Sequence, residues 1–345
     1  MKTLAKAGVA LLLPWIVLEL GLRIAGYHAP DNRSRTLLFP RFPAFYEPDR
    51  DLAWKLRPNV AWQARDFVQP FTTDGEGHRS TPQPEGDAGA PRVDFIGDSS
   101  TFGYGSLDAS TFPAVLADLA AEAGTPVRAR NLGVPGYNAQ SARLIAASVD
   151  EPAAVTVVMV GFNDHFPANR SAAEDLWIRR AAYACFASRV CALLFDHLAE
   201  PRAAKQTPPT EYRPAVSPEE YREQLGETVR ALRERGSEPI LLVYPSILGD
   251  EETRAAVASY WKHPRSLVDA NVEAHPRYQQ ITREVAAAEG VRIVDLAEIF
   301  DAAGNEGLHI DWVHPNDAGY RLIAQSILPE VQAALAAKRA APPSD

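Results

Sequence analysis

Four short polar stretches of this sequence hold residue types that together could carry out acyl transfer. The first contains Ser99, and the last contains Asp311 and His314, three residues apart. A serine hydroxyl is a weak nucleophile unless a base takes its proton, and histidine suits this task because its pKa lies near neutral pH. A carboxylate close to the histidine can fix the tautomer of its ring. The sequence therefore predicts Ser99 as nucleophile, His314 as base and Asp311 as the group that orients the base.

The two middle stretches contain glycines and an asparagine that could bind the oxyanion formed during acyl transfer. N–H donors aimed at this developing charge lower the barrier, and a glycine lets the backbone approach closely. We expect the donors to be the backbone amides of Ser99 and Gly136 and the side-chain NH₂ of Asn163. Gly133 competes with Gly136 for this role, and Gly136 is preferred because it lies closer to the helix that follows.

Short apolar runs along the same part of the chain are typical of buried strands. These runs are residues 92–97, 127–132, 154–160, 239–244 and 291–296. Helices are expected at residues 112–122, 139–148, 217–236 and 317–337, the last kinked or broken at Pro329. Strands that alternate with helices indicate an α/β domain whose parallel sheet is covered on both faces. Ligands bind such sheets at the carboxyl ends of the strands, next to which the polar stretches lie.

These four stretches, in this order, resemble the SGNH (GDSL-type) hydrolase family, which is named after its Ser, Gly, Asn and His residues. The resemblance covers residues 92–335. Matched by motif, the family's nucleophile, oxyanion residues and Asp-x-x-His pair fall on Ser99, Gly136, Asn163, Asp311 and His314. The resemblance implies a three-layer α/β/α sandwich with a five-stranded parallel sheet in flavodoxin-like order. It also implies an esterase that cleaves carboxylic esters of glycans, lipids or small molecules.

Three other functions fit parts of the pattern. An O-acyltransferase would use the same triad to pass the acyl group to a hydroxyl of a polysaccharide. A metal-dependent phosphoesterase needs several His and Asp ligands; His309, Asp311 and His314 could present some, but no Asp-x-His precedes Gly97. A family member that only binds would not need the complete set of catalytic residues. We therefore expect an esterase that uses no metal and no organic cofactor.

Four further polar residues lie beside the expected catalytic groups. Asp98 is expected to be a buried structural carboxylate that accepts backbone N–H bonds, whereas Asp164 and His165 are expected at the rim of the pocket. Leucine is common after the nucleophile in the family that this chain resembles. Here the residue is Ser100, which puts two hydroxyl groups side by side in the chain.

The charge and the first residues of the chain restrict its partners. A net charge of -9 over 345 residues argues against a nucleic-acid partner, because binding to phosphates comes mainly from Lys and Arg. Residues 7–27 provide about the ~20 mostly apolar residues that a membrane-spanning helix needs. We expect residues 1–27 to form a signal-anchor helix, with the catalytic domain facing the periplasm or the cell exterior. A cleaved signal peptide and an ordinary buried helix are the alternatives.

The rest of the chain divides by composition. Residues 28–91 are rich in proline and aromatic residues and are expected to form an accessory segment and linker with one or two short strands. Residues 92–338 are expected to form the catalytic domain, interrupted by a helical and proline-rich insertion at residues 165–217. Residues 339–345 are expected to be a disordered tail.

The insertion at residues 165–217 is expected to contain one helix, residues 173–199. This helix either packs on the sheet or forms a lid over Ser99. Cys185 and Cys191 lie in it, and in a continuous helix they would be ~9 Å apart along the axis, beyond the reach of a disulfide. The sequence therefore predicts free cysteines.

Overall fold

A computed structural model gives the three-dimensional structure. It describes residues 2–27, 45–63, 69–84, 89–186, 188–191, 193–194, 209–246, 251–261 and 263–340. The chain forms two compact units, of which one comprises residues 1–55 and 173–207 and the other residues 56–172 and 208–345. The expected tail, residues 339–345, lies largely outside the described residues.

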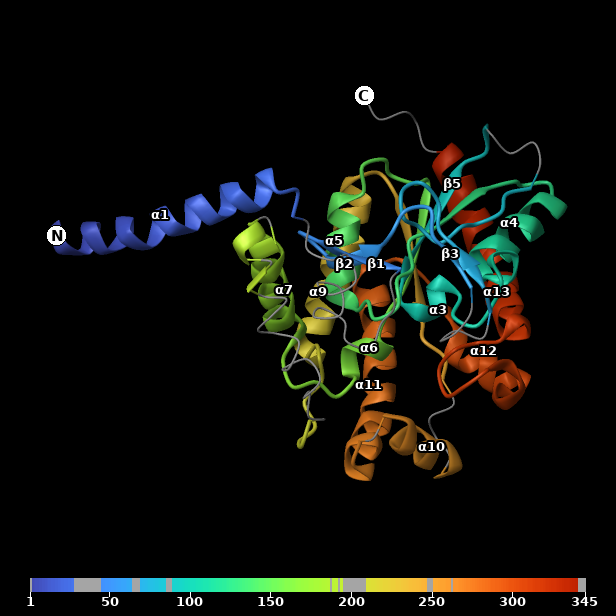
Figure 1. Ribbon diagram of the computed structural model, residues 1–345. Coiled ribbons are helices and arrows are strands. Elements are labelled where there is room, and N and C mark those ends of the chain that lie inside the picture. Colours follow the sequence, from blue (N-terminus) through green and yellow to red (C-terminus); the bar gives the residue numbers. More distant parts are fainter. Residues whose placement is uncertain are drawn as a thin grey trace. The chain divides into compact units, whose positions relative to one another are not determined.

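The second unit is built on a five-stranded, wholly parallel sheet (Figure 1). Its strands are β5 (Arg92–Gly97), β6 (Arg128–Asn131), β7 (Val155–Met159), β8 (Glu238–Val243) and β9 (Arg292–Asp295). Their spatial order is β6-β5-β7-β8-β9, which is the flavodoxin-like order. The expected five strands and their α/β fold class are therefore confirmed.

Helices cover both faces of this sheet, as Figure 1 shows. On one face α4 (Phe112–Glu122) packs against α13 (Asp317–Ala340). On the other face α9 (Pro218–Glu234) packs against α5 (Ala139–Ser148) and α11 (Arg265–Glu289). Further helices in the described part of this unit are α3 (Ser99–Phe102), α6 (Phe162–His165), α10 (Glu251–Trp261) and α12 (Leu296–Ala303), with 3-10 turns at Asp108–Ser110 and Asn305–Leu308.

Successive side chains of a strand point to opposite faces of the sheet, and in β5 the side chains on both faces are buried. Val93 and Phe95 of β5 belong to the core formed with α4 and α13, and the Phe95 ring meets Phe112 of α4 edge to face. Asp94 and Ile96 between them are also buried, on the opposite face. A strand buried on both faces has a nearly continuous apolar sequence, which is why the central strands β5, β7 and β8 can be recognised in the sequence.

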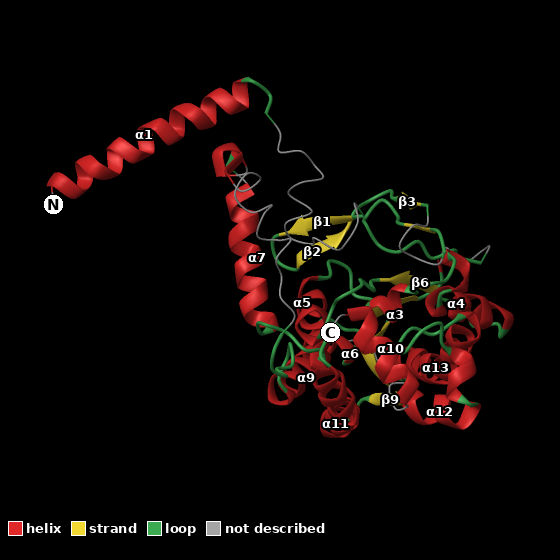
Figure 2. Cartoon of the chain, turned by 60° about the horizontal axis from the view of Figure 1, so that its bottom comes forward, coloured by secondary structure: helices red, strands yellow, loops and turns green. Residues whose placement is uncertain are grey.

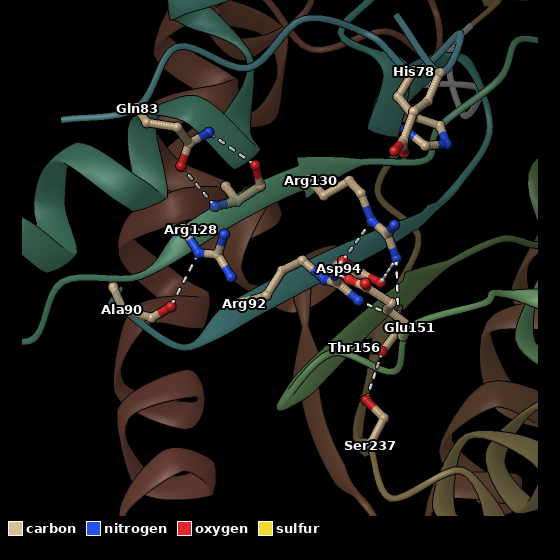
Figure 3. A network of polar contacts seen from close by, with 12 residues as sticks. His78, Gln83, Ala90, Arg92, Asp94, Arg128, Arg130, Glu151, Thr156 and Ser237 are labelled. Carbon is tan, nitrogen blue, oxygen red and sulfur yellow. Dashed lines mark hydrogen bonds and ion pairs between the residues drawn. The ribbon is translucent and has the colours of Figure 1, made fainter. Parts of the chain in front are cut away.

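Charged and polar side chains hold the amino ends of the strands, at the edge opposite the polar stretches (Figure 3). Arg130 donates two hydrogen bonds to Asp94, at 3.0 and 2.5 Å, and Arg92 forms an ion pair with Glu151. The charges of these arginines and carboxylates are thus paired with one another. We therefore assign this edge a structural role.

Residues before β5 cover the exposed edge of β6. The side chain of Gln83 accepts a hydrogen bond from the backbone N–H of Ala129 and donates one to its carbonyl group, as Figure 3 shows. Arg79 forms an isolated antiparallel bridge with Asn131. An unpaired strand edge can recruit other chains, and these contacts remove that risk. The same segment contains a short antiparallel pair, β3 (Ala61–Trp62) and β4 (Phe71–Thr72).

The first unit contains α1 (Lys2–Ile24), α7 (Ala172–Phe186) and a two-stranded sheet of β1 (Tyr46–Asp49) and β2 (Ala53–Leu56), labelled in Figure 2. Glu19 of α1 accepts hydrogen bonds from the Ser188 hydroxyl and the Val190 N–H. The hydrogen bond from the N–H of Val190 has the largest effect on the pKa of Glu19, which this bond and the other hydrogen bonds lower to about 2.

The expected membrane-spanning helix is not found. The helix α1 forms where expected, but among the residues that the structure describes no helix has both the length and the apolar character needed to cross a membrane. Glu19 and Arg23 interrupt its apolar sequence and form an ion pair of 2.7 Å with each other.

Two details of the helices differ from expectation. Of the expected kink or break at Pro329, the break does not occur, because α13 continues through this residue. The predicted helix 173–199 is wrong, because α7 ends at Phe186 and a bend follows at Ser188. Cys191 is disulfide-bonded, so the prediction of free cysteines is also wrong. That prediction assumed a continuous helix between the two cysteines.

Candidate active site

Ser99 lies where β5 turns into the short helix α3. Asp98 is the N-cap residue of α3, and its carboxylate accepts a hydrogen bond from the backbone N–H of Ser100. Ser99 is the first residue of the helix, where backbone N–H groups have no partner within the helix. Its side chain is half-buried, whereas Asp98 and Ser100 on either side are buried. The fold therefore presents the Ser99 hydroxyl at the carboxyl end of β5.

The structure brings Asp311, His314 and Ser99 into one hydrogen-bonded series. Nε2 of His314 lies 2.7 Å from Oγ of Ser99, and Nδ1 lies 2.7 Å from Oδ2 of Asp311. The other carboxylate oxygen of Asp311 accepts the backbone N–H groups of Val313 and His314 at 2.9 and 2.8 Å. These bonds close a tight turn, which fixes the spacing of the two side chains.

The pKa of Asp311 lies below its ordinary value. Burial acts to raise it, but the hydrogen bonds from the side chain and backbone of His314, together with the charge of that residue, outweigh this effect. Asp311 is therefore ionised near neutral pH. An ionised carboxylate at Nδ1 favours the ring tautomer whose Nε2 can accept the proton of Ser99.

Gly136 and Gly133 differ in their environment. Val134, Pro135, Gly136 and Tyr137 form a turn closed by the Tyr137 N–H on the Val134 carbonyl, 3.1 Å apart. Gly136 has φ +87° and is exposed, in agreement with a type II turn that has proline second and glycine third.

The N–H of Gly133, in contrast, donates to Oδ1 of Asn131, and the residue is buried. A Cβ at Gly133 would lie 2.3 Å from the backbone N of Phe102. Gly133 is thus needed for close packing against α3, which supports the preference for Gly136 as an oxyanion donor.

Asn163 belongs to α6, directly after β7. Its Nδ2 donates to the Tyr137 carbonyl at 2.9 Å and makes a longer bond of 3.3 Å to Oδ2 of Asp98. The amide is therefore held beside the turn that contains Gly136 and beside the N-cap of α3.

Ser100 does not compete with Ser99. Its hydroxyl is buried and lies 2.5 Å from the hydroxyl of Tyr244, which donates to Asp98 at 3.1 Å. Burial raises the pKa of Asp98 to about 6, against the lowering effect of the Ser100 N–H. The expectation that Asp98 is a buried acceptor of a backbone N–H is confirmed. Tyr244 follows β8, and no motif in the sequence pointed to its role.

Asp164 and His165 were expected at the rim of the pocket, and this expectation is wrong because both residues are fully buried. Oδ1 of Asp164 accepts the N–H of Ala139 at the start of α5, and burial raises the pKa of Asp164 to about 7. The ring of His165 lies between Asn271 and His275 of α11, at 2.7 and 2.8 Å. The sequence could not show this, because the partners on α11 are about a hundred residues away.

His309 was the one histidine that could have joined Asp311 and His314 around a metal ion. Its Nδ1 lies 3.0 Å from the carbonyl of Asn305, and its ring packs against Phe300. Within the described ranges, no group of three or more His, Cys, Asp or Glu side chains is arranged to hold a metal ion.

A parallel α/β sheet with Ser, His and Asp hydrogen-bonded in series beyond its carboxyl edge has the arrangement of a serine hydrolase. The sequence matches the GDSL-like Lipase/Acylhydrolase family over residues 95–322, well over half of the chain. The chain belongs to this family, the GDSL-type hydrolases that its motifs resemble, and it is an ester-cleaving hydrolase.

Several solved structures are similar to this chain. An acetylxylan esterase from Geobacillus stearothermophilus, Axe2, is 17% identical, with a TM-score of 0.46, over 70% of this chain and 94% of that one. The enzyme LAE5 from the metagenome of Lake Arreo is 24% identical, with a TM-score of 0.44, over 71% and 95%. A lipase/acylhydrolase from Enterococcus faecalis is 18% identical, with a TM-score of 0.45, over 70% and 96%. No curated protein matches the sequence.

Proposed function

We propose that the protein is a serine esterase that cleaves carboxylic esters through a covalent acyl-enzyme on Ser99. The observation that carries this proposal is the pair of 2.7 Å contacts that joins Asp311, His314 and Ser99. In this geometry one imidazole nitrogen can take the Ser99 proton while the other is held by a carboxylate. The substrate is an ester of a glycan, a lipid or a small molecule.

Acylation begins when Oγ of Ser99 attacks the ester carbonyl carbon and its proton moves to Nε2 of His314. The carbonyl oxygen becomes an oxyanion, which accepts hydrogen bonds from the amides of Ser99 and Gly136 and from Nδ2 of Asn163. Asp311 stabilises the imidazolium that has formed. When the tetrahedral intermediate collapses, the bond to the alcohol oxygen breaks, and His314 protonates the departing alcohol.

Deacylation repeats these steps with water. His314 takes a proton from water as the water oxygen attacks the acyl carbon, and the same donors bind the new oxyanion. Collapse breaks the bond to Oγ of Ser99, which recovers its proton from His314. The products are the carboxylic acid and a free enzyme, so every proton that His314 accepts is returned.

An assay of the full chain with p-nitrophenyl esters from acetate to decanoate, with and without EDTA, tests this proposal. We expect release of p-nitrophenol that EDTA does not affect and that Ser99→Ala abolishes. Ser100→Ala is the matched control and should retain turnover, because its hydroxyl bonds Tyr244 rather than His314. Activity that survives Ser99→Ala and is lost in EDTA would instead indicate a metal-dependent reaction.

We also propose that the catalytic domain works outside the cytoplasm, attached to a membrane by α1. The disulfide of Cys191 supports an oxidising compartment. Large apolar side chains of α1 are exposed, among them Val17 at 63% and Ile24 at 86%. Fractionation of cells that produce the full chain, or the chain without residues 1–27, tests this. Only the full chain should sediment with membranes and need detergent for release; a full chain found in the soluble fraction would contradict the proposal.

A further inference from the structure

The loop that follows α3 is fixed to the nucleophile. Gly103 ends α3 in the left-handed conformation, with φ +88°, and both Gly103 N–H and Tyr104 N–H donate to the carbonyl of Ser99, at 3.1 and 2.9 Å. Such paired bonds close a helix in a fixed geometry. The backbone of Tyr104 therefore has a defined position relative to Ser99.

The ring of Tyr104 stacks on the imidazole of His314. The ring centroids are 4.2 Å apart and the planes are inclined by 28°. The carbonyl of Tyr104 accepts a hydrogen bond from the hydroxyl of Tyr320, which is buried in α13. The aromatic ring that covers His314 is thus held by its backbone on both sides, through Ser99 and through α13.

Arg79 holds the next part of the same loop. Its side chain is almost fully buried, donates to the carbonyl of Ser106 at 2.7 Å and forms an ion pair of 2.7 Å with Asp108. The guanidinium also lies over the ring of Phe102, 4.6 Å from its centroid. A buried charge is tolerated only with partners of this kind. The hydroxyl of Ser106 in turn donates to Asp317, three residues after His314.

We propose that Tyr104 is a positioning residue for His314, and that Arg79 holds the loop from which Tyr104 reaches the imidazole. The inference rests on the proposed function. Stacking limits rotation of the ring of His314, so that Nδ1 faces Asp311 while Nε2 faces Ser99. It also stabilises the imidazolium in the transition state, because the face of an aromatic ring attracts a cation.

This assigns a function to residues that precede the sheet. The segment around Arg79 lies outside the four motif stretches, and nothing in its sequence predicted a link to catalysis. Through Ser106 and Asp108 it nevertheless supports the loop that covers the catalytic base. An interaction that is stronger in the transition state than in the ground state changes kcat and leaves KM unchanged.

Steady-state kinetics of Tyr104→Phe and Tyr104→Leu in the full chain, with an activated ester, test the proposal. Tyr104→Phe keeps the ring and should retain kcat within about two-fold. Tyr104→Leu should lower kcat roughly five-fold at unchanged KM, the range expected for one aromatic contact. A purely structural role would lower the melting temperature of Tyr104→Leu and leave kcat of the folded enzyme unchanged. That result, or an equal loss in Tyr104→Phe, would overturn the proposal.

Arg79 is tested through its coupling to Tyr104. Arg79→Met should lower kcat, and the double variant with Tyr104→Leu should be no slower than Tyr104→Leu alone, because both act through the same contact. Multiplying effects would contradict this. Arg79→Lys provides a milder variant if Arg79→Met does not fold. Arg230→Met, which removes an exposed arginine paired with Glu289, is the matched control and should leave kcat unchanged.

A fluorophosphonate that forms an adduct with activated serines separates the failure of this inference from failure of the proposed function. If the folded wild-type protein neither hydrolyses esters nor forms an adduct at Ser99, the proposed function fails. If the wild type forms the adduct and Tyr104→Leu forms it at the same rate, only the positioning role fails. Slower labelling of Tyr104→Leu, restored in Tyr104→Phe, supports the inference.

Discussion

At the scale of single residues, the site combines side chains that a substrate can reach with buried side chains that support them. Ser99 and His314 are half-buried and can meet a substrate, whereas Asp98 and Ser100 are buried, and the Asp98 carboxylate caps the helix that begins with Ser99. The two adjacent serines are therefore not equivalent. Their difference follows from the helix start: the first residue faces the end of the sheet, and the second faces Tyr244.

Asn163→Ala tests the proposed oxyanion donor. We expect kcat to fall by ~10²–10³ with little change in KM, as in other enzymes that lose one such donor. Kinetics with p-nitrophenyl acetate would measure both constants. Asn305→Ala is a suitable control, since its amide bonds the Ser246 carbonyl. A loss of less than about ten-fold in Asn163→Ala would assign the role to another group.

Asp164 should make the stability of the fold depend on pH. Burial raises its pKa from 3.8 to about 7 in the folded state. Between these values the folded state binds a proton that the unfolded state has released, so the free energy of unfolding falls as pH rises through this window. Asp164→Asn removes this loss. Urea unfolding should show the variant gaining roughly 2 kcal/mol relative to wild type between pH 5 and pH 8.

A difference between Asp164→Asn and wild type that does not change with pH would contradict this prediction. Comparison of the two proteins at each pH is essential, because buried histidines act in the opposite direction. Burial lowers the pKa of His165 to about 4, so its contribution to the free energy of unfolding rises as pH increases from about 4 to 6.5. That contribution is common to both proteins and cancels in the difference.

At the scale of elements, the site depends on how closely the start of α3 packs on the loop after β6. Gly133→Ala should disturb this packing, because the added Cβ would lie 2.3 Å from the backbone N of Phe102. A backbone atom cannot move aside as the end of a flexible side chain can. Overpacking of this kind costs roughly 1–3 kcal/mol. We also expect kcat to fall, because α3 begins with Ser99.

Denaturant unfolding and ester kinetics check the prediction for Gly133→Ala. Gly75→Ala is a matched control, since nothing lies within 4 Å of its Cβ position and its φ is not in the left-handed region. The control should unfold within about 0.5 kcal/mol of wild type, the usual range for surface substitutions. Equal stability and activity of the two variants would show that α3 tolerates the displacement.

At the scale of the whole molecule, the disulfide depends on the compartment in which the protein folds, because disulfides form in oxidising surroundings. Cys191 is disulfide-bonded, and the chain's other cysteine is Cys185. The intact mass of the full chain, isolated without reductant, should therefore rise by two hydrogens on reduction, and Cys191→Ser should abolish this change. An unchanged mass, or a dimer on a non-reducing gel, would contradict a disulfide within one chain.

Most of the fold around the site could be predicted from local pattern. The three central strands β5, β7 and β8 are short runs buried on both faces, and α4 and α5 have the predicted limits. A capping box of Ser217 and Glu220 begins α9, in agreement with the helix predicted at residues 217–236. The long helix α11 was not predicted, and it contains Pro276, a residue type that usually breaks a helix. The break after α7 was missed because no glycine or proline marks it.

The sequence by itself determined the residue types and their order: a serine after one buried strand, an asparagine after another, and an aspartate and a histidine on one turn. Local spacing settles such features, since three residues on a tight turn fix the distance from Asp311 to His314. Only the tertiary structure decided which distant groups support them. Tyr104 contacts His314, Tyr244 contacts Asp98, and Arg79 contacts the loop that carries Tyr104. These groups meet because separate parts of the chain return to the same edge of the sheet, and no local pattern encodes that proximity.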